Sequence, residues 1–344
     1  MEISTDIREA LKERHYTPIE IIGKGGYAQT ILAENSIYHQ KFAIKVADLS
    51  APKNSIRDCY INEVQILKTL YHPNIVYIYD YFETHNYLFI VLEYCENRSL
   101  AHYLKKNHGN ISSSDKKSIM LQIAQALEYC HEKGIAHLDI KPSNIVVDNL
   151  GNPHLCDFGF SAFISNDTER YKYNKFAGSP CYQAPEIRNH QLYNPFSADM
   201  FSLGVTFFEI FYEENPFRKF TGAELDSVQK GDYIDAFPFQ NKDFYRLVRK
   251  LCKYKPEYRL DIHQVLTSDY FTKNVKQKKM MTLNLPRKRG RLNSNEQSLK
   301  DIGANTNSYT NVSGRKILKM VNNTARLSHV YCGQSTTTAT FSSC

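Results

Sequence analysis

The chain has 344 residues, 42% of them apolar and 23% charged, which is the composition of a soluble globular protein with room for two ordinary domains or one large two-lobed domain. It contains no apolar run of the roughly 18 residues that a membrane-spanning helix needs. The first residues, MEISTDIREALKERHY, are too polar for a secretory signal peptide, so we expect an intracellular protein.

The net charge of +7 is concentrated in one segment. Residues 273–291 hold eight lysines and arginines and no acid, and the remainder of the chain has 35 basic against 36 acidic residues. This balance argues against a nucleic-acid-binding body, so an anionic partner is expected only for the basic segment. The eight cysteines form no C-x-x-C pair, which argues against a disulfide framework or a thiolate zinc site.

Residues 19–94 alternate short β-branched and aromatic runs with turns, which predicts an antiparallel sheet. The runs are IEIIGKGG, QTILAE, KFAIKVADL, IVYIYDYFE and YLFIVLEY. One stretch within this part differs, because Ile56, Tyr60 and Leu67 recur at helical spacing before a proline. We therefore expect one helix to interrupt the sheet.

After Cys95 the apolar period becomes helical. A helix is expected over 115–134, with Ser112 to Ser114 as candidate N-caps and Gly134 as the stop. Two more helices are expected over 197–212 and 241–254.

The predicted fold class is α+β, with a small, mostly β lobe joined by a short hinge to a larger, mainly helical lobe. We assign residues 16–94 to the first lobe and 95–272 to the second. Residues 1–15 are read as an N-terminal extension, and 273–344 as a basic tail rich in Ser, Thr and Asn that is largely disordered.

The stretch GKGGYA at 23–28 follows a predicted strand and precedes another. Its glycines allow backbone amides to approach phosphate oxygens closely. A plain glycine-rich hairpin could have the same sequence, so this motif alone does not distinguish a phosphate-binding turn from a hairpin.

Lys45 ends the apolar run FAIK, an unfavourable place for a cation that has no anionic partner. Glu63 lies on the apolar stripe of the predicted helix, which should pack against the sheet. Two opposite charges in apolar settings predict an ion pair in which Glu63 orients Lys45 toward a bound phosphate. A lysine that extends to solvent is the alternative.

Two further stretches carry chemically useful side chains. HLDIKPSN at 137–144 brings together a proton acceptor, Asp139, a cation, Lys141, and an amide, Asn144, that can bind a metal. CDFGFS at 156–161 places Asp157 before a glycine, where a carboxylate can hold Mg²⁺ against phosphates.

These motifs, together with APE at 184–186, Asp199 and Arg259, occur in an order that resembles the eukaryotic-type serine/threonine protein kinase family over residues 16–272. The resemblance implies the two-lobed protein kinase fold and the use of ATP with Mg²⁺. It implies that Asp139 is the catalytic base and that Lys141 steadies the transferred phosphoryl group. Asn144 and Asp157 would bind Mg²⁺, and Lys45, paired with Glu63, would hold the α and β phosphates.

The same resemblance implies an ATP site around the glycine-rich turn and the hinge. Leu92 would be the gatekeeper, and the backbone of Glu93 to Cys95 would meet adenine. Leu67, Ile78, His137 and Phe158 would stack as the hydrophobic column of an active kinase. The full set of ATP-binding residues is Ile22, Gly23, Lys24, Gly25, Gly26, Tyr27, Ala28, Thr30, Ala43, Lys45, Glu93, Cys95 and Val146.

By the same resemblance, Lys141 and Ser179 are typical of kinases that act on serine and threonine hydroxyls of proteins. DFGFS and GSPCYQAPE look most similar to the calmodulin-dependent and AMP-activated kinase group. A nucleotide-binding pseudokinase scaffold, which binds ATP without transferring phosphate, is the alternative function.

The chain departs from the family pattern at Leu138, where most members carry an arginine that binds a phosphorylated residue of the activation segment. The position of that phosphorylated residue is Lys175. Because both partners of the contact are replaced, we expect activity without activation-segment phosphorylation, with Lys175 as a fixed positive charge.

The basic tail supports two hypotheses about partners. KQKKMMTLNLPRKRGR is similar to a bipartite nuclear import signal. Such a signal would bind an import receptor, and the protein would then be found in the nucleus as well as in the cytoplasm. SGRKILKMVNNTARL at 313–327 has the basic and apolar pattern of a calmodulin target or an autoinhibitory segment. A solvated, non-specific basic tail is the alternative.

Overall fold

The computed structural model describes residues 3–25, 28–50, 54–84, 86–166, 170–231, 234, 239 and 241–273. All of these residues lie in the first of the chain's two units, residues 1–288. Residues 274–344 are outside the described part, so the import-signal and calmodulin-target hypotheses stay predictions. Among the helices of the described part, none is both long and apolar enough to cross a bilayer.

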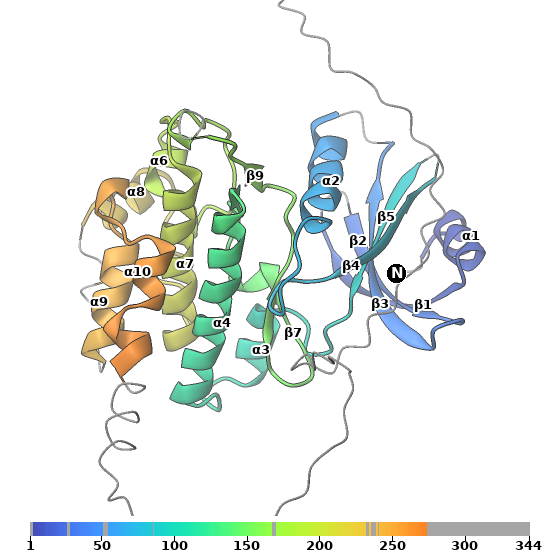
Figure 1. Cartoon of the computed structure of the whole chain (residues 1–344), viewed down its shortest axis with the longest axis horizontal. Coiled ribbons are helices and arrows are strands. Elements are labelled where there is room, and N and C mark those ends of the chain that lie inside the picture. The colour runs from blue at the N-terminus through green and yellow to red at the C-terminus, as the bar shows by residue number, and fades with distance from the viewer. Residues whose placement is uncertain are drawn as a thin grey trace, which may run out of the picture. The chain divides into compact units, whose positions relative to one another are not determined.

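The first lobe is built on a five-stranded antiparallel sheet in the order β1-β2-β3-β5-β4 (Figure 1). Helix α2 (Asn54–Leu67) follows the third strand, as the helical spacing predicted. The strands are β1 (Tyr16–Lys24), β2 (Ala28–Asn35), β3 (Gln40–Asp48), β4 (Ile78–Glu83) and β5 (Tyr87–Glu93). The predicted antiparallel sheet with one inserted helix is confirmed.

The alternation of side chains along β3 divides the lobe into two apolar clusters. Phe42 and Ile44 face one cluster, and Ala43 and Ala47 face the other, which includes residues of α2. Lys45 has the same parity as Ala43 and Ala47. It therefore lies on the face of the sheet that α2 covers, where the ion pair with Glu63 can form.

Helix α1 (Thr5–Glu13) lies within the predicted N-terminal extension and packs on β1 (Figure 1). Its buried side chains Ile7 and Leu11, at 2% and 0% exposure, join the cluster that contains Phe42 and Ile44. These first residues thus complete the core on the face of the sheet opposite α2.

The second lobe is mainly helical, and its central helices are α4 (Ser113–Glu132) and α7 (Pro195–Tyr212). Ser112 caps α4 by accepting a hydrogen bond from the Asp115 backbone N–H, and Gly134 follows the helix with φ +73°. Both sequence signals are confirmed. The described part of this lobe also contains α3 (Leu100–Lys106), α6 (Pro185–Arg188), α8 (Gly222–Lys230), α9 (Lys242–Leu251), α10 (Ile262–Leu266) and the 3₁₀ turn η3 (Pro256–Tyr258).

Short strands near the junction with the sheet position the polar loops. Strand β6 (Ile135–Ala136) pairs with β9 (Ala162–Phe163), and β7 (Ile145–Val147) pairs with β8 (Pro153–Leu155). The loop that carries Asp139 runs from β6 into the 3₁₀ turn η1 (Pro142–Asn144). Because Ile145 pairs with Leu155, the residues just outside this hairpin, Asn144 and Cys156, are also opposite each other.

We expect Leu11→Ala to lower the free energy of unfolding by about 2–5 kcal/mol, the range for truncating a fully buried leucine. Chemical denaturation measures the change, and Lys12→Ala on the exposed face of the same helix is the matched control. If the two variants unfold alike, α1 does not contribute to the core.

Candidate active site

The loop before Asp139 has a strained backbone conformation that one carboxylate holds in place. Leu138 has φ +65°, in the left-handed region that is unfavourable for a leucine. Asp199 on α7, which is fully buried, accepts hydrogen bonds from the backbone N–H of His137 at 2.8 Å and of Leu138 at 2.7 Å. Its Oδ2 also contacts His131 Nε2 at 2.9 Å. These contacts fix the direction in which Asp139 leaves the loop.

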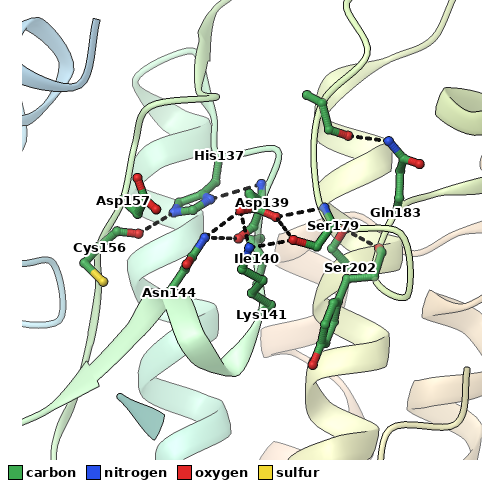
Figure 2. A network of polar contacts seen from close by, with 12 residues as sticks. His137, Asp139, Ile140, Lys141, Asn144, Cys156, Asp157, Ser179, Gln183 and Ser202 are labelled. Carbon is green, nitrogen blue, oxygen red and sulfur yellow. Dashed lines mark hydrogen bonds and ion pairs between the residues drawn. The ribbon is translucent and has the colours of Figure 1, made fainter. Parts of the chain in front are cut away.

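Asp139 is the centre of the polar network shown in Figure 2. Its Oδ2 accepts hydrogen bonds from Lys141 Nζ at 2.6 Å and Asn144 Nδ2 at 2.7 Å. Its Oδ1 accepts two from Ser179, one from the backbone N–H and one from the hydroxyl, both at 3.0 Å. Lys141 Nζ also donates to the Ser179 hydroxyl, so these four side chains form one connected group.

Gly178 allows the activation segment to lie directly on this loop. It has φ +93°, and a Cβ at this position would be 2.8 Å from the carbonyl oxygen of Leu138. No larger residue fits without moving the backbone, since real Cβ contacts are not that short. Ser179 is thereby held within hydrogen-bond distance of Asp139.

Lys45 joins the sheet, α2 and the segment after β8. Its Nζ lies 2.7 Å from Glu63 Oε2 and 2.9 Å from Asp157 Oδ1. Burial alone would lower the pKa of Lys45, but the carboxylates of Glu63 and Asp157 outweigh burial and raise it above its ordinary value. Burial raises the pKa of Glu63, while for Asp157 the nearby ammonium group of Lys45 outweighs burial and lowers the pKa. Lys45 is therefore a cation and Asp157 an anion at neutral pH.

Asn144 and Asp157 come together at the end of the β7–β8 hairpin. The Cys156 backbone N–H donates to the carbonyl of Asn144 at 3.0 Å, which places residue 157 next to Asn144. The Asn144 amide nitrogen donates to Asp139, and within the described residues its side-chain oxygen accepts no hydrogen bond. An ionised carboxylate and a free amide oxygen are hard oxygen ligands, the kind that Mg²⁺ prefers, so the residues fit this ion.

His137 links the two loops through its ring. Its Nε2 lies 3.1 Å from the Cys156 carbonyl oxygen, and its ring centroid is 4.7 Å from that of Phe158 (Figure 2 shows the first contact). Phe158, Leu67 and Ile78 are buried in one continuous cluster. The side chains expected to form the hydrophobic column thus lie in one buried region.

The predicted ATP-binding residues lie along the sheet and its connection to the helices. The Gly25 backbone N–H donates to the Ala28 carbonyl at 2.8 Å and closes the turn after β1. Thr30 pairs with Lys45, and Ala43 pairs with Leu92, on adjacent strands. Gly26 and Tyr27 lie outside the described residues. The positions of the others are as follows: Ile22, Gly23 and Lys24 end β1, Glu93 ends β5, Cys95 follows it, and Val146 is in β7.

The activation segment has contacts that the sequence did not predict. Tyr193, which is 4% exposed, donates from its hydroxyl to the carbonyl oxygen of Lys175 at 2.7 Å. Its backbone N–H donates to the Tyr173 carbonyl at 2.9 Å, and the two rings pack edge to face. Phe176 stacks on His190. No local sequence signal marks these pairs, because they depend on how residues 170–193 fold back on themselves.

A buried ion pair anchors the end of this segment. Arg259 donates from Nη1 and Nη2 to the two oxygens of Glu186 at 2.6 and 2.7 Å, and both residues are buried. Such a bidentate pair fixes α6 geometrically. The sequence analysis named APE and Arg259 as separate motifs, and the structure brings Glu186 and Arg259 into contact.

Comparison with known proteins agrees with the family resemblance that the motifs show over residues 16–272. Residues 16–271 match the family described as Protein kinase domain. Serine/threonine-protein kinase SIK1 of Mus musculus is 31% identical over 262 residues, which are 75% of this chain and 33% of that relative. SIK1 of Rattus norvegicus has the same identity and coverage. The chain thus spans about a third of the length of these curated relatives.

We expect Asp199→Asn to lower the free energy of unfolding by about 3 kcal/mol. The asparagine amide has one oxygen, which can accept a hydrogen bond from only one of the two buried backbone N–H groups, and its nitrogen then faces the other N–H. The hydrogen bond that remains is also weaker, because its acceptor is no longer charged. Chemical denaturation measures the change, with the exposed Asp269→Asn as control. A change as small as that of the control would mean that the strain at Leu138 is held by other contacts.

Proposed function

The chain belongs to the protein kinase family, and on this premise we propose that it transfers the γ-phosphate of ATP to serine and threonine hydroxyls of proteins. The observation that carries the proposal is the grouping of Lys45, Asp139, Lys141, Asn144 and Asp157 at the junction of the two lobes. Phosphoryl transfer needs alignment and charge neutralisation more than covalent help from the protein, and these residues supply both.

Asp139 is suited to orient a hydroxyl and to accept its proton. Its carboxylate is 3% exposed and receives hydrogen bonds from Lys141, Asn144 and Ser179, so its direction is fixed before any substrate arrives. Lys141, bound to the same carboxylate, is placed to offset negative charge on the transferred group. Lys45, oriented by Glu63, would hold the phosphates of ATP.

Asn144 and Asp157 are the residues that would hold Mg²⁺ in this site. When bound, the ion neutralises phosphate charge and aligns the triphosphate. The contact of Asp157 with Lys45 supports the assignment, because it brings a metal ligand and a phosphate ligand within 2.9 Å of each other.

Selection of serine and threonine is supported by the contacts of Lys141. This lysine bridges Asp139 and the hydroxyl of Ser179, the two positions from which the sequence predicted this preference. The relatives from Mus musculus and Rattus norvegicus are themselves named serine/threonine-protein kinases.

We expect Asp139→Asn to lower kcat for phosphorylation of a serine peptide by at least about 100-fold, since general-base groups contribute about 10²–10⁴. Lys45→Met should cause a comparable loss. Radiolabelled phosphate transfer measures the activity, and ATP binding to Asp139→Asn, followed by fluorescence of a nucleotide analogue, shows that the variant is folded. If the wild type binds ATP and phosphorylates nothing, the pseudokinase scaffold is the correct function.

We further propose that activity does not require phosphorylation of the activation segment. Leu138 is 3% exposed and apolar, so it gives a phosphate nothing to bind. Lys175 occupies the usual phosphorylation position and has its carbonyl held by Tyr193. The contacts of Tyr173, Phe176 and Tyr193 order the segment in the unmodified chain and support the proposal.

We expect phosphatase treatment of the purified protein to change its kcat by less than about twofold, because none of the contacts described for the segment involves a phosphate. Mass spectrometry verifies that phosphate is absent from the hydroxyl side chains of this region, which are possible regulatory sites: Ser161, Ser165, Thr168, Tyr171 and Tyr173. Loss of activity on treatment, restored by rephosphorylation, would disprove this part of the proposal.

The location and the partners of the tail also belong to this proposal. We propose an intracellular protein, cytoplasmic and nuclear, that acts on protein substrates. Recognition by an import receptor or by calmodulin is proposed from the sequence of residues 273–344 alone.

A further inference from the structure

A cavity of about 150 Å³ lies in the second lobe, between the ends of helices α8 and α9 and the turn η3. The last residues of α8, several residues of the stretch 249–255 and Tyr258 line it. Among the described residues that line it, none belongs to the group around Asp139. The cavity is therefore separate from the candidate active site.

The described part of the cavity wall contains four cations and no acid. Lys230 and Arg249 lie in the last turns of α8 and α9, where cations are ordinary partners of a helix C-terminus. Lys230 is also paired with Asp226 at 2.6 Å. Lys253 and Lys255 follow α9, and neither forms an ion pair with a residue of the described part. Two positive charges at the cavity thus have no acidic partner there.

A buried hydrogen-bond donor without a partner also lines the cavity. Gln229 is 4% exposed, and its Oε1 accepts a hydrogen bond from Arg188 Nη2 at 2.5 Å. Because an arginine side chain has only donors, the amide oxygen must face it, and the amide cannot be turned around. Its Nε2 is buried and donates to none of the described residues. A buried donor without an acceptor is unfavourable, which indicates that an acceptor belongs in this cavity.

The buried ion pair of Arg259 with Glu186 fixes the backbone of the cavity wall. Arg259 donates from Nε to the carbonyl oxygen of Lys253 at 2.7 Å and from Nη2 to that of Tyr254 at 3.0 Å. Tyr254 in turn donates from its hydroxyl to Asp226 at 3.0 Å. The lysines therefore extend from a stretch of chain that is already ordered, which lowers the entropy lost when a ligand binds.

The size and the charge of the cavity restrict its ligand. Sites for whole small molecules are typically about 300–1,000 Å³, so this cavity fits a single small group rather than a nucleotide. A phosphate monoester carries a charge of about −1.5 to −2 at neutral pH and has three acceptor oxygens. It can accept from Lys253, Lys255 and Gln229 at once, whereas a carboxylate has one charge and two oxygens.

We propose that this cavity is a binding site for a phosphate monoester, which Lys253 and Lys255 neutralise and the Gln229 amide orients. The inference does not depend on the proposed function, because it assigns no role to the residues around Asp139. The group is supplied either as free phosphate or as a phosphorylated serine or threonine of a protein segment, and the experiment separates these two sources.

The test measures the affinity of the full-length, phosphatase-treated chain for three probes by isothermal titration calorimetry at constant ionic strength. The probes are inorganic phosphate, a phosphoserine peptide and the same peptide with unmodified serine. An excess of a non-hydrolysable ATP analogue with Mg²⁺ is present, so that the probes do not bind where the phosphates of ATP would bind.

Two variants remove the proposed contacts. Lys253→Gln/Lys255→Gln removes both charges, and Gln229→Glu keeps an oxygen for Arg188 but places a negative charge in the wall. Lys242→Gln/Lys250→Gln is the matched control, because it removes two charges from exposed residues of α9 that do not line the cavity.

Inorganic phosphate should bind the wild type, and its Kd should rise about tenfold or more in both variants, since each loses a charge-assisted contact or gains a repulsive one. The control should stay within about twofold of the wild type. A phosphoserine peptide that binds about tenfold more tightly than inorganic phosphate, while the unmodified peptide does not bind, identifies a protein segment as the source. Equal affinities identify free phosphate, and thermal melting shows that each variant is folded.

A wild type that binds neither inorganic phosphate nor the phosphopeptide would overturn the inference. The same conclusion follows if the Kd of Lys253→Gln/Lys255→Gln equals that of the control, or if succinate competes as well as phosphate does, because the cavity would then not recognise phosphate. If Gln229→Glu does not fold, the variant of the two lysines decides alone.

Discussion

The carboxylate of Asp199 determines the geometry of the loop on which the candidate active site depends. It accepts hydrogen bonds from the backbone of His137 and Leu138 and so stabilises a leucine at φ +65°, a conformation unfavourable for this residue. The direction of Asp139 follows from that conformation, and so does the position of the Leu138 carbonyl oxygen against which Gly178 lies. One fully buried acid on α7 thus helps to position the loop that carries Asp139 and, through it, the segment around Gly178.

A second constraint is electrostatic. Lys45 lies between two carboxylates, one from α2 and one from the segment after β8, and this arrangement joins the β lobe to the polar loops of the helical lobe. Glu63, with 1% side-chain exposure, would be an unfavourable charge there without the lysine. The same cation therefore joins the two lobes and lowers the pKa of Asp157.

The sequence predicted those features that are determined locally or by a short pattern. The apolar run that ends at Lys45 and the helical stripe that carries Glu63 predicted an ion pair between these two residues, and the structure contains it. The antiparallel sheet, the cap at Ser112 and the stop at Gly134 were predicted in the same way. The order of motifs gave Asp139, Asn144 and Asp157. Asn144 contacts Asp139, and the β7–β8 hairpin brings residue 157 next to Asn144, although their chemical roles stay predictions.

Other features depend on packing that no short pattern encodes. The first fifteen residues look polar, and only the fold shows that Ile7 and Leu11 cover one face of the sheet. The contacts of Tyr193 with residues 173 and 175, and the pairing of Arg218 with Glu209, join residues by folded loops and have no recurring spacing.

The close fit at Gly178 has a mechanical consequence. Because a Cβ at position 178 would be only 2.8 Å from the Leu138 carbonyl oxygen, the backbone of the activation segment lies directly against the loop that carries Asp139. A small molecule that wedged the segment away from this loop would also remove the two hydrogen bonds that Ser179 donates to Asp139, so this seam is a place at which the surroundings of Asp139 can be altered from outside.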